Sequence, residues 1–203
     1  MSYNPEIHHR RSIRLKGYDY SQAGMYYITI CCKDKLWRFG KIENGEMILN
    51  DFGQIAQEEW EKLPERYPNV ILDVFQIMPN HIHFVFVVTE DDMPYVGAPL
   101  AGALDDTNPA RAGASPAPTT VRQNDDITVV RQNNDVTVGN IIGAYKSLVL
   151  NRCLELCKQQ NEWLGKFWQR NYYESIIRSQ KSYQNVYEYI VANPMNWQTD
   201  ELF

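Results

Sequence analysis

Two apolar runs separated by a Pro-Asn turn are the feature that most constrains how this chain can fold. VILDVFQIM (70–78) and HIHFVFVV (81–88) are rich in β-branched and aromatic residues, and only Pro79 and Asn80 stand between them. Runs of this length and composition, bounded by turn residues, are typical of buried strands. The sequence therefore predicts two strands joined through this turn.

Three segments before this pair carry further secondary-structure signals. MYYITICC (25–32) has the composition of a strand, and KIENGEMIL (41–49) contains Asn44-Gly45, a strong signal for a two-residue hairpin turn. A helix should follow, opened by Asp51 with Gln54 in a capping-box-like arrangement and ended before Pro68.

The C-terminal part predicts a long amphipathic helix over 138–160, a strand segment over 167–178 and a last helix over 182–197 that Pro194 should end. This order of strands and helices is not a strict βαβ alternation. It predicts an α+β fold, a ferredoxin-like antiparallel sheet with helices packed on it.

Residues 89–138 interrupt this pattern. They are rich in Gly, Ala and Pro and end in a tandem nine-residue repeat, VRQNDDITV followed by VRQNNDVTV. Two copies are too few for a repeat fold. We expect one domain made of residues 1–88 and 139–203, with 89–138 as a flexible acidic insertion that grew by duplication; a partner-binding loop is the alternative interpretation.

Charge and composition leave a nucleic-acid partner possible. The net charge is −5, but residues 88–138 hold eight acids and three arginines, which leaves 20 − 3 = 17 basic and 25 − 8 = 17 acidic residues elsewhere. No apolar run is long enough to span a membrane, and the N-terminus lacks a secretory signal, so we expect a cytoplasmic protein. The four cysteines lack C-x-x-C spacing and are expected to be buried free thiols.

The second strand of the pair carries His81 and His83, half of the four histidines in the chain. Alternate strand residues share a face, so both imidazoles should project to one side, with Cα atoms ~6.6 Å apart. Two imidazoles at this separation can converge on one metal ion. The turn should place the pair near the edge of the sheet, and a third ligand has to come from elsewhere. A hydrogen-bonded pair on a half-exposed face is the alternative.

A second polar set lies in YEYIVANP, near the C-terminus. Tyr189 and Asn193 are four residues apart and should share one face of a helix. An amide oxygen can bind a hard cation, and a phenol can act as a nucleophile when a Lewis acid polarises its target. Core packing of Tyr189 is the alternative.

The joint pattern resembles the single-tyrosine HUH transposases, in particular the branch of REP-associated tyrosine transposases. The resemblance rests on MPNHIHF, IIGAYKSLVLNR, FWQRNYYESIIR and YIVANPMNW in that order, and on RRSIRLKGYDYS and YYITICC near the start. It covers most of residues 10–87 and 139–197.

The resemblance implies specific roles. His81 and His83 match the metal ligands, Asn193 the position that can supply the third one, and Tyr189 the nucleophile, with Tyr187 as the runner-up. It also implies Mg or Mn as cofactor, single-stranded or hairpin DNA as partner, a homodimer and a 5′-phosphotyrosine intermediate in DNA cleavage and rejoining.

Contacts to nucleic acid are expected from basic and aromatic residues, for each of which ordinary packing or a solvated charge is an equal alternative. The candidates are Arg14, Lys146, Arg152, Trp168, Arg170, Tyr172 and Tyr173.

Two other functions remain open at this point. One is a domesticated or inactive relative that only binds nucleic-acid hairpins, and the other is a metal-dependent hydrolase that recruits Glu188 or Asp73.

Overall fold

The computed structural model describes residues 22–90 and 136–200. Its main sheet has four antiparallel strands in the order β4-β5-β1-β6, formed by Val70–Ile77, His81–Val88, Gly24–Cys31 and Tyr173–Ile177. Helix α1 (Asp51–Glu61) lies between β1 and β4 in the chain, and helix α3 (Val138–Gln159) between β5 and β6. This is the ferredoxin-like α+β fold that the sequence predicts.

Several short elements lie outside the main sheet. The short helix α2 (Leu63–Arg66) precedes β4, and β2 (Gly40–Glu43) pairs with β3 (Glu46–Leu49) in a separate hairpin. Asn44 and Gly45 at its turn have φ of 53° and 80°, as the predicted two-residue turn requires. Single 3₁₀ turns cover Lys33–Lys35 and Trp197–Thr199.

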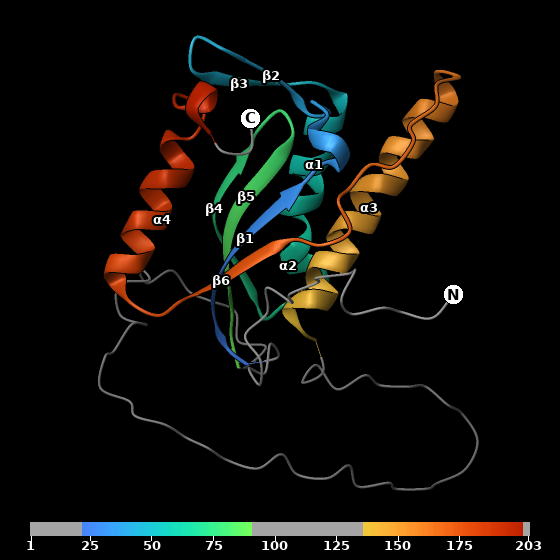
Figure 1. Ribbon diagram of the computed structural model, residues 1–203. Helices are drawn as coiled ribbons and strands as arrows, with labels where there is room; N and C mark the ends of the chain where they lie inside the picture. The colour runs from blue at the N-terminus through green and yellow to red at the C-terminus, as the bar shows by residue number, and fades with distance from the viewer. Residues whose placement is uncertain (1–21, 91–135, 201–203) are drawn as a thin grey trace, which may run out of the picture.

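Helices cover the two faces of the sheet unequally. Helices α1, α2 and α3 lie on one side, and α4 (Gln180–Ala192) lies alone on the other (Figure 1). The main core therefore lies under α1 and α3, where Tyr145 packs edge-on against Phe84 and donates a hydrogen bond to the Ala56 carbonyl at 2.9 Å. All four cysteines are buried free thiols, as predicted.

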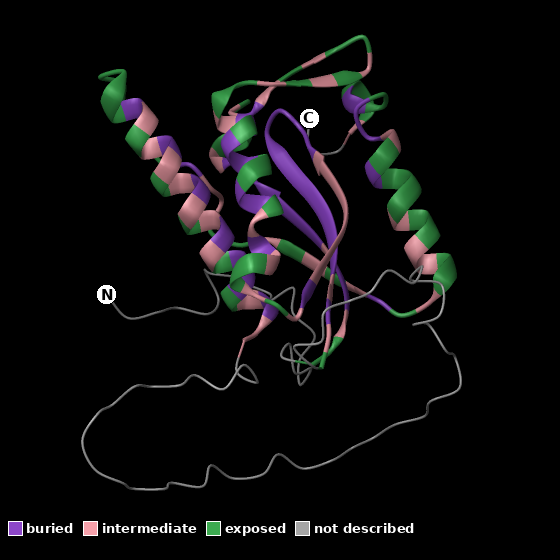
Figure 2. Cartoon of the chain, turned by 180° about the vertical axis from the view of Figure 1, so that it is seen from behind, coloured by how far each residue is buried: buried purple, intermediate pink, exposed green. Residues whose placement is uncertain are grey.

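The face under α4 has a much smaller core, built on Met25, Val85, Ile177 and Ile190. Strand β5 is buried along most of its length, whereas α4 is largely exposed on its outer surface (Figure 2). Only part of α4 contacts the sheet. Space for polar side chains therefore remains between the rest of the helix and the sheet.

Three local predictions were wrong. Asn50, not Asp51, caps α1 through its side-chain oxygen, which accepts from the Gly53 amide at 3.0 Å. Helix α4 begins before the predicted position 182, because Ser179 caps its start, and it does not reach 197, because it ends before Pro194 as expected from the proline. Strand β5 lies between β4 and β1, so the histidine pair is on a central strand and not at the edge of the sheet.

The predicted strand over 167–178 is also too long. Only Tyr173–Ile177 pairs with β1, while the preceding segment crosses the end of β1: the Lys33 amide donates to the Phe167 carbonyl and the Gln169 amide to the Cys31 carbonyl. Its backbone groups are thus satisfied outside the ladder. Most of the predicted insertion, 89–138, and Arg14 lie outside the described residues.

Candidate functional site

The histidine pair lies at the start of β5, on the face of the sheet that α4 covers. His81 and His83 are both buried, and their Nε2 atoms are 2.9 Å apart. The strand alternation that the sequence predicts therefore brings the two rings together on one side of the sheet.

Neighbouring side chains fix the orientation of both rings from behind. His81 Nδ1 lies 2.7 Å from Asn80 Oδ1, and because an amide oxygen only accepts, His81 Nδ1 must donate. His83 Nδ1 lies 2.8 Å from Thr29 Oγ1, whose own hydroxyl donates to Tyr27 at 3.2 Å. The Tyr27 hydroxyl also lies 2.9 Å from His83 Nδ1, so this nitrogen contacts two hydroxyls, while the Nε2 atoms of the two rings face each other.

Burial keeps both imidazoles neutral. It lowers the pKa of His81 to about 3, with a smaller contribution from Lys35. It also lowers the pKa of His83 well below the usual value; the neighbouring His81 acts in the same direction and Asp200 in the opposite one. Neutral imidazoles are the form that binds metal ions.

Helix α4 brings Tyr189 and Asn193 to the same place. The Tyr189 ring lies edge-on to the His83 ring, with centroids 5.3 Å apart, and its side chain is 47% exposed. Asn193 is buried, and its Oδ1 accepts no hydrogen bond from the described residues. The two α4 positions therefore approach the face of the sheet that carries the histidines.

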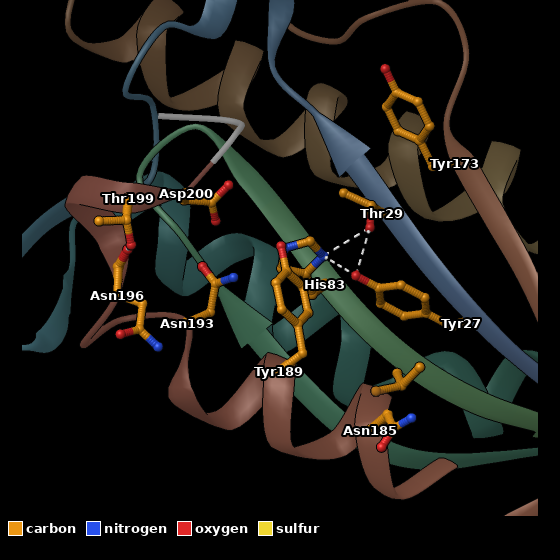
Figure 3. Close-up of a pocket in the computed structure, with 11 residues that line it drawn as sticks. Tyr27, Thr29, His83, Tyr173, Asn185, Tyr189, Asn193, Asn196, Thr199 and Asp200 are labelled. Atoms are coloured by element: carbon orange, nitrogen blue, oxygen red, sulfur yellow. Dashed lines mark hydrogen bonds between the residues drawn. The ribbon is translucent and has the colours of Figure 1, made fainter. Parts of the chain in front are cut away.

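These residues line one hollow of about 780 Å³ between the sheet and α4, shown in Figure 3. Its wall consists of uncharged polar and aromatic residues, neutral His83 and one acid: Tyr27, Thr29, His83, Tyr173, Asn185, Val186, Tyr189, Asn193, Asn196, Thr199 and Asp200. No lysine or arginine of the described chain lines it. The hollow has the size of an ordinary small-molecule site.

Asp200 also lies beside the histidines, a position that the sequence analysis did not predict. Its carboxylate is 2% exposed, with Oδ2 3.7 Å from His81 Nε2. One ligand atom each from His81, His83 and Asp200 lies within 4.8 Å of the other two. Asp200 follows the 3₁₀ turn at Trp197–Thr199, and no motif or periodicity marks that position.

The donor set fits a divalent cation. The Nε2 atoms of the two neutral rings converge at 2.9 Å, and the buried Asn193 oxygen accepts no hydrogen bond from the described residues. The Asp200 carboxylate adds a negative charge beside them. Two imidazoles with oxygen donors suit Mn²⁺ well and Mg²⁺ less readily.

Except for Tyr173, the predicted nucleic-acid contacts among the described residues lie away from this hollow. Lys146 donates to the Gln169 carbonyl at 2.8 Å, and Trp168 donates to the Lys146 carbonyl at 2.9 Å, so both fasten α3 to the segment before β6. Arg152 makes ion pairs with Glu58 and Glu59. Arg170 is exposed beside Tyr172, whereas Tyr173 lines the hollow.

The runner-up residues also point elsewhere. Tyr187 packs its ring against Tyr183 and is not part of the wall of the hollow. Glu188 accepts from Gln184 along the surface of α4, and Asp73 accepts from the Tyr183 hydroxyl at 2.9 Å. Neither Glu188 nor Asp73 lies in the wall of the hollow beside the histidines.

Comparison with known proteins finds a relative that matches nearly the whole chain. It is 40% identical over 201 residues to an uncharacterised protein of Haemophilus influenzae, and the match covers 99% of this chain and 97% of that one. The chain therefore belongs to the same family as that protein. No protein-family profile matches it.

The fold has a counterpart among solved structures. A REP-associated tyrosine transposase bound to a REP hairpin superposes with a TM-score of 0.52 at 15% sequence identity, covering 91% of this chain and 74% of the other. At this identity the likeness concerns the fold alone. In the described part of the chain no helix is long and apolar enough to cross a membrane.

Proposed function

We propose that the protein is a metal-dependent single-stranded DNA endonuclease and strand transferase, a transposase of the single-tyrosine HUH type. The observation that carries this proposal is the hollow under α4, where the accessible phenol of Tyr189 lies against a pair of neutral, oriented histidines. The transposase-like fold supports it.

His81, His83 and Asn193 would hold a Mg or Mn ion, with Asp200 as a further ligand. When bound, the ion would supply Lewis-acid polarisation of the scissile phosphate. Asn80 holds Nδ1 of His81, and Thr29 and Tyr27 hold Nδ1 of His83, so that both Nε2 atoms point to the place where the ion would bind.

Tyr189 acts as the nucleophile in this proposal. Its phenolic oxygen forms a bond to phosphorus, and the bond from phosphorus to the 3′-oxygen breaks. The phenol loses its proton, and the leaving 3′-oxygen gains one, so a 3′-hydroxyl and a 5′-phosphotyrosine result. Because a later 3′-hydroxyl can reverse the reaction, rejoining needs no external energy.

The proposed substrate is single-stranded DNA beside a hairpin. The solved structure of similar fold contains a REP hairpin, which supports this choice of substrate. A complete cycle of cutting and joining two ends requires two nucleophilic tyrosines. We therefore propose that the active form is a homodimer.

The proposal is tested by incubating the protein with Mn²⁺ and a library of labelled single-stranded hairpins, and reading covalent protein–DNA bands on a denaturing gel. Tyr189→Phe and His81→Ala should each abolish the band. Tyr187→Phe is the matched control and should retain it, because Tyr187 packs on Tyr183 outside the hollow. A band that survives Tyr189→Phe would refute the role of Tyr189.

One observation favours a second candidate. Two histidines and an aspartate are a ligand set that hydrolases also use, with water as the nucleophile. In that case Tyr189→Phe would still cut DNA and no covalent band would form. Hairpin binding without any cutting would instead identify a relative that only binds nucleic acid.

A further inference from the structure

The hollow under α4 leaves one requirement of the proposed function unmet. Its described wall contains no lysine or arginine, whereas proteins bind the phosphate backbone mainly through such cations. An ion at the histidines would neutralise charge only at the scissile phosphate. The cations that hold the rest of the DNA strand must therefore lie on another surface.

A second hollow, of about 770 Å³, has this character. It lies between the C-terminal end of α3 and the segment that follows β1, and we name it the Trp163 groove after its most exposed side chain. Residues that line it include Lys33, Arg38, Leu154, Lys158, Trp163 and Lys166. Its four cations face two acids, Asp34 and Glu162, which gives a net charge of 4 − 2 = +2 in a chain of net charge −5.

Two cations of the groove are available to a ligand. Lys158 and Lys166 are exposed, and neither forms an ion pair with an acid in the described part of the chain. The ion pairs found there use other cations: Lys33, Lys41, Lys62, Arg66 and Arg152. Arg38 is held in place, since it donates to the Lys166 carbonyl at 3.0 Å and lies over the Phe167 ring.

Trp163 gives the groove an aromatic surface. Its side chain is 91% exposed, more than any other large apolar residue among those described. The ring lies over Gly165, where a Cβ would come within 2.8 and 2.9 Å of its Cζ3 and Cη2 atoms, and where φ is +67°. The absence of a side chain at Gly165 thus accommodates the indole in this position and leaves its outer face open.

The groove opens at the end of the sheet where the histidine pair lies. Cys31, the last residue of β1, pairs with His81, and Lys33 in the groove follows only two residues later. Helix α4 lines the first hollow and α3 lines the groove. These two helices lie on opposite faces of the sheet (Figure 1). A strand that passes around the end of β1 can contact both the first hollow and the groove.

We propose that the Trp163 groove binds a single-stranded DNA segment that flanks the cleaved site, a role that rests on the proposed function. Trp163 stacks on one base, and Lys158 and Lys166 each contact a phosphate. Single-strand binding combines aromatic platforms with cationic grooves in this way. The cationic surplus, in a chain that is acidic overall, favours DNA over a protein partner.

The test uses the full-length protein in EDTA, so that no cleavage occurs, and a fluorescein-labelled hairpin with single-stranded flanks. Trp163→Ala should weaken binding about 5- to 150-fold, because stacking contributes roughly 1–3 kcal/mol per base, and Trp163→Phe should recover part of the loss. Lys158→Ala combined with Lys166→Ala should reduce the slope of log affinity against log salt by about 1.4, or ~0.7 for each phosphate.

Lys41→Ala is the matched control, since Lys41 is exposed on the β2–β3 hairpin and forms an ion pair with Glu43. It should leave affinity unchanged. Trp163 is so exposed that its replacement removes almost no buried area, and a thermal melt verifies the fold. Equal affinities of wild type, Trp163→Ala and the double lysine variant would overturn the inference.

The binding test of the Trp163 groove and the adduct test of the proposed function can fail independently of each other. Formation of covalent adducts together with unchanged binding in Trp163→Ala would refute the groove alone. Loss of binding in Trp163→Ala, in a protein that never forms an adduct, would establish the groove as a DNA site and refute the strand-transfer chemistry.

Discussion

At the scale of single residues, two side chains hold the histidine pair in position. Asn80 and Thr29 are both buried and each holds one histidine by Nδ1. Thr29 reaches His83 because the register of β1 and β5 pairs these two residues directly. Their role is to position the histidines, and it can be tested by metal binding without any DNA.

We expect Asn80→Ala and Thr29→Val each to weaken Mn²⁺ binding about 10- to 100-fold, because partners of metal-bound histidines have effects of this size. Isothermal titration calorimetry measures the affinity. Thr89→Val is a suitable control, since the Thr89 hydroxyl bonds to the Asn69 carbonyl near the end of β5 beyond Val88. Unchanged affinity in Thr29→Val would show that Thr29 does not hold His83 for a metal.

The buried histidines also predict how stability depends on pH in the metal-free protein. Their pKa values are lowered on folding, so between about pH 6.5 and the folded pKa, about 3 for His81, the unfolded chain binds more protons. The stabilisation is complete above about pH 6.5 and is lost as the pH falls. Each histidine should contribute a slope of about 1.4 kcal/mol per pH unit.

Urea unfolding between pH 7 and pH 4 measures this slope. A variant with His81→Gln and His83→Gln should show a shallower fall in the free energy of unfolding over the same range. Parallel curves for the two proteins would contradict neutral, buried histidines.

At the scale of elements, α4 is the least firmly held part of the site. It packs on the sheet through the small cluster around Ile190, and the Tyr183 hydroxyl donates to Asp73 on β4. Burial and the neighbouring Asp73 raise the pKa of Tyr183 to about 12, so the hydroxyl remains a donor at neutral pH. The position of Tyr189 therefore depends on a few contacts.

Tyr183→Phe should lower the free energy of unfolding by about 0.5–1.5 kcal/mol, the usual contribution of one hydrogen bond. It should also speed amide hydrogen exchange in α4 more than in α3, because the lost bond belongs to α4 alone. Tyr187→Phe is the matched control for both measurements. Equal exchange rates in α4 of the two variants would show that the Asp73 contact does not secure the helix.

The elements also show what the sequence can and cannot predict. Local patterns identified the strands around Pro79-Asn80, the Asn44-Gly45 turn and the shared helical face of Tyr189 and Asn193, because each depends on spacing along the chain. Asp200 was missed because its place beside His81 depends on how the chain turns after α4, which no periodicity reports. The strand over 167–178 was predicted too long because backbone pairing with the end of β1 overrides its apolar composition.

At the scale of the whole molecule, the chain before and after the predicted insertion builds one ferredoxin-like sheet, with β1, β4 and β5 from the first part and β6 from the second. The end of β5 and the start of α3 both lie at the lower end of the sheet in Figure 1. Val136 already packs against the core, immediately before α3. The second described part of the chain therefore contacts the core from its first residue.

Replacement of residues 91–135 by a short Gly-Ser linker should leave the thermal melting temperature within a few degrees of the wild-type value, because the core around Tyr145 and Phe84 is unchanged. Circular dichroism follows the melt, and hairpin-dependent adduct formation reports on the site. Loss of cooperative unfolding would show that the segment belongs to the domain.

The central claim is that Tyr189 forms the covalent bond to DNA, and peptide mass mapping of a trapped adduct tests it most directly. Trypsin cleaves after Lys181, and no lysine or arginine follows, so one peptide, residues 182–203, carries Tyr183, Tyr187 and Tyr189. Fragmentation of this peptide should place the nucleotide-phosphate mass on Tyr189. The mass on Tyr187, on Tyr183 or on any other peptide would contradict the account.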